Sequence, residues 1–204
     1  MYLNKNDQTG RSMVEMLGVL AIIGVLSVGG IAGYSKAMTK FKISKTMDQL
    51  SMIVANIRTM FSSQSSYDGL STTTAISLGL IPDEMQLSSS TANNAFQGNV
   101  VIQSTTGDAS GGVAENAADS RAFTVTYGSI GKDVCITLIT SDWGTGTSSG
   151  LIGIGVEEQT TSNEAVTTAV ATGWKKNSAG ELPVSPIGAT SLCKEYNTIS
   201  WEYF

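Results

Sequence analysis

The residues best placed to do chemistry lie near the amino terminus, and Glu15 is the first of them. This carboxylate stands at the edge of a long uncharged run, where an ionised side chain is costly unless a cation pairs with it. If the chain were cut after Gly10, the new α-amine on Arg11 would lie about one helical turn from Glu15. The two charges could then compensate each other within one chain or between neighbouring chains in lipid. A glutamate at the membrane interface, stabilised by the helix dipole, is the simpler alternative.

The other reactive residue types argue against an enzyme. Histidine is absent, which excludes Ser-His-Asp triads, imidazole bases and histidine metal ligands. The only cysteines, Cys135 and Cys193, form no CxxC motif, so a zinc site built from cysteine clusters is excluded as well. A single disulfide is their simplest use, and two buried free thiols are the alternative. We therefore expect no catalytic residue, no metal and no cofactor.

Length and charge set the next limits. The chain has 204 residues, enough for one globular domain plus a membrane element. Its net charge is −5, with 12 basic and 17 acidic residues. Such a chain lacks the basic surface that neutralises phosphates, so nucleic acid is not expected as the main ligand.

The element that must position Glu15 is a hydrophobic helix. No residue from Met16 to Ser35 is charged, and a helix over this stretch would span a bilayer core of roughly 30 Å. A secretory signal peptide is the first alternative, but its cleavage site should follow the apolar region. Here the small residue, Gly10, precedes that region and follows a polar leader. Cleavage there would leave the membrane helix on the product.

The stretch Gly10-Arg11-Ser12-Met13-Val14-Glu15, followed by the uncharged run, resembles the cleavage and methylation signature of type IV prepilins and related pseudopilins. In that family a prepilin peptidase cuts after the glycine and methylates the new amine, and the glutamate helps each subunit to dock into the filament. The resemblance implies that Gly10 is the cleavage residue, Arg11 the N-methylated terminus and Glu15 the assembly carboxylate.

Lysines follow the apolar run. Four of them lie within a short stretch, at Lys36, Lys40, Lys42 and Lys45, while the leader carries only Lys5. By the positive-inside rule this bias would place the later segment in the cytoplasm, opposite to the topology of the family. We follow the resemblance, because the cysteines and the polar, weakly charged remainder suit an exterior location.

Beyond the membrane segment the pattern becomes that of an amphipathic helix packed on a sheet. Apolar residues recur at steps of four and three, at Ile43, Met47, Leu50, Val54, Ile57 and Phe61. After Ser62 the composition turns to Ser, Thr, Gly, Ala and Asn with short apolar runs, which is typical of a small β-rich domain. A short helix is predicted over 72–78 and strands over 99–104, 122–127 and 134–140, with weaker strands over 151–157 and 165–174.

The order GLIPDEM, NAFQGNVVI and FTVTYGSIGKDVCITLI resembles the head of type IVb pilins. Cys193 stands where that family closes its carboxy-terminal variable loop, which implies a Cys135–Cys193 disulfide. The resemblance thus predicts an α+β, pilin-like fold in which a long amino-terminal helix packs on an antiparallel sheet. It also predicts the domain boundaries: a leader over 1–10, the helix over 11–62 and the head over 63–204.

Three further groups of residues have ordinary interpretations. Gly144, Gly146 and Gly150 lack the lysine and the spacing of a P-loop. Asp108, Glu115 and Asp119 could offer oxygen ligands to calcium, but their spacing is not that of an EF-hand and solvated loop carboxylates are commoner. Aromatic residues near the end could form a subunit contact or cover the sheet, and we favour the sheet: Tyr196, Trp201, Tyr203 and Phe204.

The predicted function is structural. We expect a precursor in the bacterial inner membrane, processed by a prepilin peptidase, delivered by a pilus assembly platform and assembled with copies of itself into an extracellular pilus that supports adhesion, aggregation or motility. One alternative is a minor pilin, or a pseudopilin of a type II secretion or DNA-uptake apparatus. The other is a monomeric membrane-anchored adhesin, which would not be cut at Gly10.

Overall fold

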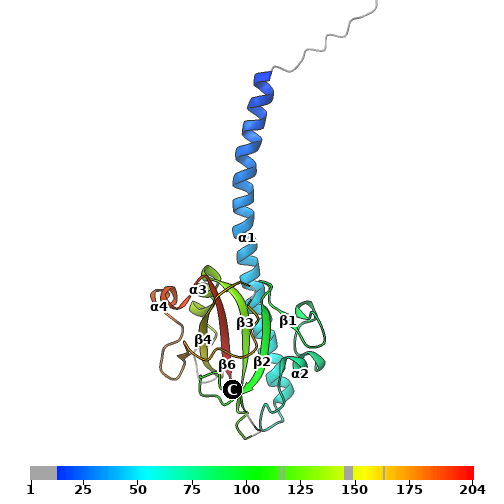
Figure 1. The fold of residues 1–204 in the computed structure, drawn as a ribbon, viewed down its shortest axis with the longest axis vertical. Helices are drawn as coiled ribbons and strands as arrows, with labels where there is room; N and C mark the ends of the chain where they lie inside the picture. Colours follow the sequence, from blue (N-terminus) through cyan, green and yellow to red (C-terminus); the bar gives the residue numbers. More distant parts are fainter. Residues whose placement is uncertain (1–12, 115, 117, 145–148, 163) are drawn as a thin grey trace, which may run out of the picture. The chain divides into compact units, whose positions relative to one another are not determined.

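The computed structural model describes residues 13–204 except 115, 117, 145–148 and 163. Figure 1 shows the fold as a ribbon coloured along the sequence, with most of its elements labelled. They are α1 (Met13–Phe61), α2 (Thr72–Ser77), the 3-10 helix η1 (Asp83–Met85), β1 (Ala92–Asn93), β2 (Asn99–Thr105), β3 (Ala122–Gly131), α3 (Lys132–Thr140), β4 (Leu151–Gln159), β5 (Lys175–Lys176), α4 (Pro186–Leu192) and β6 (Tyr196–Tyr203). The chain falls into two compact units, one ending at Phe41 and one beginning at Lys42, so α1 contributes to both.

The second unit, Lys42–Phe204, is called the head from here on, and it includes the last part of α1 in addition to the predicted head over 63–204. It is built on an antiparallel sheet. Its strands lie in the order β1-β2-β3-β6-β4-β5, and each neighbouring pair is antiparallel. The last strand in sequence, β6, therefore lies at the centre between β3 and β4. The predicted α+β fold with an antiparallel sheet is confirmed.

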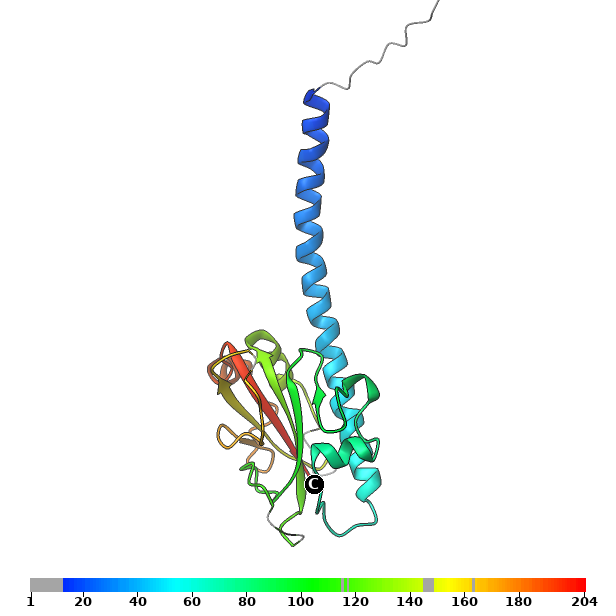
Figure 2. The same ribbon diagram turned by 45° about the vertical axis from the view of Figure 1, so that its right-hand side comes forward.

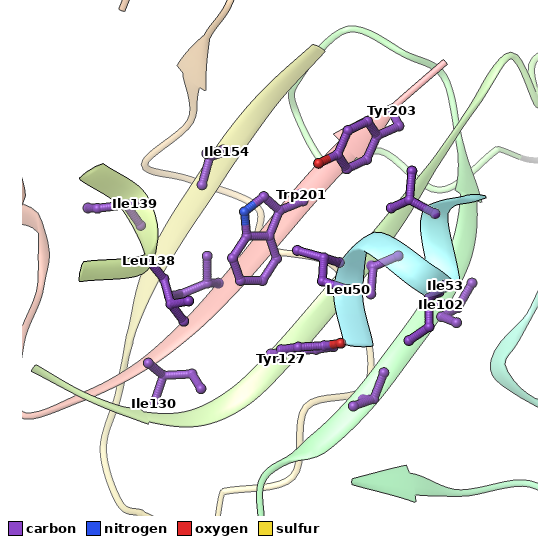
Figure 3. Packing of buried hydrophobic residues seen from close by; sticks show 14 of the residues in the cluster. Leu50, Ile53, Ile102, Tyr127, Ile130, Leu138, Ile139, Ile154, Trp201 and Tyr203 are labelled. Atoms are coloured by element: carbon purple, nitrogen blue, oxygen red, sulfur yellow. The ribbon is translucent and has the colours of Figure 1, made fainter. Parts of the chain in front are cut away.

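One face of the sheet is covered by the part of α1 that belongs to the head (Figure 2). Leu50, Ile53 and Ile57 are fully buried there, while Ile43, Met47 and Phe61 are partly buried against the same core. These positions agree with the apolar spacing predicted from the sequence. In Figure 3 the rings of Tyr127 and Trp201 project from β3 and β6 toward Leu50, and they pack edge to face at 5.5 Å.

The opposite face of the sheet is polar and is covered by loops. Thr126 and Ser200 share a hydrogen bond of 2.7 Å, and the Ser200 hydroxyl accepts a second one from the Val170 amide. Glu202, also on this face, is fully buried under the loop that contains Ala109. Buried polar groups of this kind need partners, and the covering loops supply them through their backbone.

The strand predicted over 134–140 is wrong, because this stretch forms the helix α3. Its buried residues are Val134, Cys135, Leu138 and Ile139, a spacing that places one face of a helix on the core. The threonines, which favoured a strand, instead donate their hydroxyls to carbonyl oxygens one turn earlier: Thr137 to Asp133 and Thr140 to Ile136. Packing and local hydrogen bonds thus override the intrinsic preference of the β-branched residues.

The weaker strand predicted over 165–174 is also wrong. Its backbone follows an irregular path and is held by side chains of the sheet, with the Ala169 amide donating to Gln103 and the Val170 amide to Ser200. Gly173 has φ +71°, which a regular strand does not accommodate. The other predicted elements are confirmed, as α2, β2, β3 and β4.

Candidate functional site

The first candidate site is the apolar surface of α1 before Phe41. By length and composition this helix could cross a membrane, and its most apolar window has none of its residues buried inside the chain. Met13 is 83% exposed, Val25 75% and Ile31 70%. A surface of this kind is stable only when lipid or other apolar helices cover it.

Glu15 lies in the first turn of α1 and is exposed. A carboxylate at this position interacts favourably with the positive end of the helix dipole. Among the residues that the structure describes, no cation forms an ion pair with it. Gly10 and Arg11 lie outside the described residues, so cleavage after Gly10, methylation of Arg11 and pairing of that amine with Glu15 stay predictions.

The second candidate site is the carboxy-terminal region closed by a disulfide. Cys135 in α3 and Cys193 after α4 are bonded to each other, as expected from the resemblance, and both are fully buried. Ser185 caps α4 by accepting a hydrogen bond from the Gly188 amide. The disulfide therefore ties a separately capped helix to the helix that follows β3.

A buried amide reinforces this tie. The Asn197 side chain donates 2.9 Å hydrogen bonds to the carbonyl oxygens of Ile130 and Lys194, and its oxygen accepts one of 2.7 Å from the Lys194 amide. Asn197 is fully buried. Sequence reasoning missed this residue, because no strand was predicted over 196–203. In a strand, Asn197 lies on the same face as Trp201 and Tyr203, which point into the core.

Sequence reasoning also missed Glu202, a buried carboxylate on β6. Its two oxygens accept 2.6 Å hydrogen bonds from the Thr105 hydroxyl and the Ala109 amide. Burial raises the pKa of the Glu202 carboxyl and outweighs these two hydrogen bonds, which favour the charged form. The carboxylate fastens the loop around Ala109 to the sheet, so we assign it a structural role.

The terminal aromatic residues mostly belong to the core, as predicted. Trp201 is fully buried and Tyr203 nearly so, while Tyr196 is partly buried and Phe204 is 57% exposed. Arg58, in the last turn of α1, lies over the Tyr203 ring at 5.2 Å and donates a 3.0 Å hydrogen bond to the carbonyl oxygen of Phe204. The end of the helix is thereby joined to the end of β6.

The acidic loop residues show no arrangement typical of a metal centre. Asp108 accepts a hydrogen bond from Ser110, and Asp119 accepts one of 2.8 Å from Asn116. Glu115 lies outside the described residues. Within the described part of the chain, no three potential ligands among His, Cys, Asp and Glu form a group that could hold a metal ion.

Relatives of known role match nearly the whole chain. Two of them are described as the major structural subunit of bundle-forming pilus, from Escherichia coli O111:H- and from Escherichia coli O127:H6 strain E2348/69. Each is 25% identical over 195 residues, covering 94% of this chain and 91% of the relative.

Solved structures show the same fold at lower identity. A type IVb pilin from Salmonella typhi has a TM-score of 0.52 and 19% identity, covering 78% of this chain and 98% of that one. TcpA, a type IV pilin from Vibrio cholerae El Tor, has a TM-score of 0.52 and 18% identity, covering 80% and 99%. The family described as PilS N terminal matches residues 40–202. The chain therefore belongs to the PilS N-terminal family and has the fold of a type IVb pilin.

Proposed function

We propose that this protein is the structural subunit of a type IVb-like pilus, assembled through its amino-terminal helix. The observation that carries the proposal is the uncovered apolar surface of α1 before Phe41, in a chain whose head has a closed core of its own. Lipid can cover that surface before assembly, and identical helices can cover it in a filament. The relatives from Escherichia coli are both major pilus subunits, which favours this role over that of a pseudopilin, a minor pilin or a monomeric adhesin.

The finer steps of the proposal concern processing and export. A prepilin peptidase cuts after Gly10 at the inner membrane, the amine of Arg11 is methylated, and an assembly platform moves the subunit into an extracellular filament. The Cys135–Cys193 disulfide supports an exterior location, because disulfides persist in oxidising compartments. Glu15 pairs with the amine of a neighbouring subunit, which removes the cost of an isolated carboxylate among apolar helices.

Replacing Glu15 by alanine tests this role. We expect sheared filaments to fall below detection by electron microscopy and immunoblotting, while the amount of subunit in the membrane stays normal. Asp48→Ala is the matched control, because Asp48 is an exposed carboxylate of the same helix, and it should leave filaments intact. Normal filaments from Glu15→Ala would refute the role given to Glu15.

Mass spectrometry of the mature protein tests the processing step. The expected polypeptide begins at Arg11 and carries one added methyl group. A native protein that retains Met1 and stays monomeric in the membrane would contradict the whole proposal and would favour an anchored adhesin.

A further inference from the structure

Two lysines of α1 have no partner within the described chain. Lys36 and Lys40 are both exposed, and their spacing of four residues places them on the same side of the helix. Neither takes part in an ion pair among the residues that the structure describes. The nearest acidic residues in this helix, Glu15 and Asp48, are too distant along it to pair with them.

The next two lysines, both in the head, are already engaged. Lys45 forms a 2.9 Å ion pair with Glu84, and the Lys42 ammonium lies 5.8 Å from the centre of the Phe96 ring. The four lysines that follow the apolar run are therefore not equivalent. Lys42 and Lys45 contact residues of the head, whereas Lys36 and Lys40 are exposed to the surroundings of the helix.

The position of the free pair along the helix suggests what surrounds it. At about 1.5 Å per residue, the uncharged stretch from Met16 to Ser35 is roughly 30 Å long, which equals the hydrocarbon thickness of a bilayer. Tyr34, next to the end of this stretch, is of a residue type that is enriched at the membrane–water interface. Lys36 and Lys40 would then lie about 2 Å and 8 Å beyond the end of that stretch, at the depth of the lipid phosphates.

We propose that Lys36 and Lys40 bind the phosphate groups of anionic phospholipids while the subunit resides in the membrane. The ammonium groups supply compact positive charges that suit phosphate oxygens, and their long stems allow each head to reach the phosphate layer. The inference rests on the proposed function in one respect only, namely that the apolar part of α1 lies in a bilayer. Lipid binding would also explain the presence of lysines after the apolar run without assigning them a role in topology.

Carboxylates of a second copy of this chain are the competing partner for these lysines. The position of the two lysines just after Tyr34 favours lipid, because it places both charges in the phosphate layer before any filament exists. A contact that arises only between assembled copies would not require the two free lysines to follow the membrane boundary so closely.

Electron paramagnetic resonance tests the proposal on the unassembled full-length chain. The protein is placed in phosphatidylcholine vesicles that contain spin-labelled phosphatidylglycerol or spin-labelled phosphatidylcholine, and the motionally restricted fraction of each lipid is compared. We expect a several-fold preference for phosphatidylglycerol that decreases with salt. The variant K36Q/K40Q should lose this preference, and K36R/K40R should keep it because the charge remains.

The control variant K132Q/K194Q removes the same charge from exposed positions of the head and should behave like the unchanged protein. A preference that survives in K36Q/K40Q, or that is absent from the unchanged protein, overturns the proposal. Loss of filaments by K36Q/K40Q with an unaltered lipid preference also overturns it, because the lysines would then act between copies. The lipid measurement needs no filament, so failure of the unchanged chain to assemble would refute the proposed function and not this inference.

Discussion

Breaking the disulfide should remove a large part of the stability of the head. Cys135 and Cys193 are 58 residues apart in sequence, and closing a loop of that length restricts the unfolded chain by about 4 kcal/mol of unfolding free energy. Folded domains are stable by only about 5–15 kcal/mol. For a head of this size, the loss should lower the unfolding temperature by roughly 10 °C.

Urea unfolding of the full chain in detergent micelles measures this loss. Tryptophan fluorescence, to which the buried Trp201 contributes, follows the transition in the oxidised protein, in the reduced protein and in Cys135→Ala/Cys193→Ala. Thr190→Ala, an exposed change within the closed loop, is the control and should shift the free energy of unfolding by less than about 0.5 kcal/mol.

Comparison of the reduced protein with the double alanine variant separates the stability lost with the S–S bond from the stability lost with the packing of the sulfur atoms. Reduction leaves both sulfur atoms in the core, so its cost reports the lost constraint on the unfolded chain. Alanine also removes the sulfur atoms, and its cost should be somewhat larger. If reduction alone lowered stability by less than about 1 kcal/mol, the loop-closure reasoning would be refuted, whatever the alanine variant lost.

Two other substitutions probe the two faces of the sheet. Leu50→Ala should lower the free energy of unfolding by about 2–5 kcal/mol, because Leu50 is fully buried between α1 and the sheet. Met52→Ala, at an exposed position of the same helix, should change it little, and equal effects of the two variants in urea unfolding would contradict this packing. Glu202→Gln should change the pH dependence of stability. Because the folded-state pKa of Glu202 is raised, its contribution is complete below the unfolded-state pKa and is lost as pH rises through the folded-state pKa. Glu202→Gln should therefore gain stability relative to the unchanged protein as pH rises, and parallel stability–pH curves would refute the raised pKa of Glu202.

Periodicity in the sequence was enough to predict much of the fold. The steps of four and three from Ile43 to Phe61 predicted the face of α1 that packs on the sheet, because a helix repeats every 3.6 residues whatever it contacts. Runs of β-branched residues likewise predicted β2, β3 and β4. These signals are local, so they can be read without knowing the topology.

The errors arose where a distant part of the chain decides the local structure. VCITLI has the composition of a strand, yet the place beside β3 is taken by β6, which comes from the end of the sequence. With that edge filled, the segment after β3 forms α3 and buries Cys135, where the disulfide can form. No local preference carries this information, because it depends on a pairing between Phe123 and Tyr203.

The functional residues also fall into two groups, those that could be recognised from the sequence and those that could be found only in the structure. Glu15 could be recognised because a charge beside an apolar run is unusual in any fold, and Lys36 and Lys40 stood out as charges after that run. Glu202 has no such signal in the sequence, and its burial depends on the loop that places the Ala109 amide against it. A carboxyl group that is buried only by the tertiary structure has no signature in its own sequence neighbourhood.

The distribution of exposed apolar residues on α1 limits what can cover the helix. Consecutive positions such as Ile22 and Ile23, or Val25 and Leu26, are all more than half exposed, and neighbouring residues point about 100° apart around a helix. The apolar surface therefore surrounds this part of α1, unlike the single buried face beyond Lys42. A partner with one groove would leave the other sides in water. Lipid, or a bundle in which each helix is enclosed by its neighbours, covers all sides at once, so the same sequence suits both a membrane precursor and the interior of a filament.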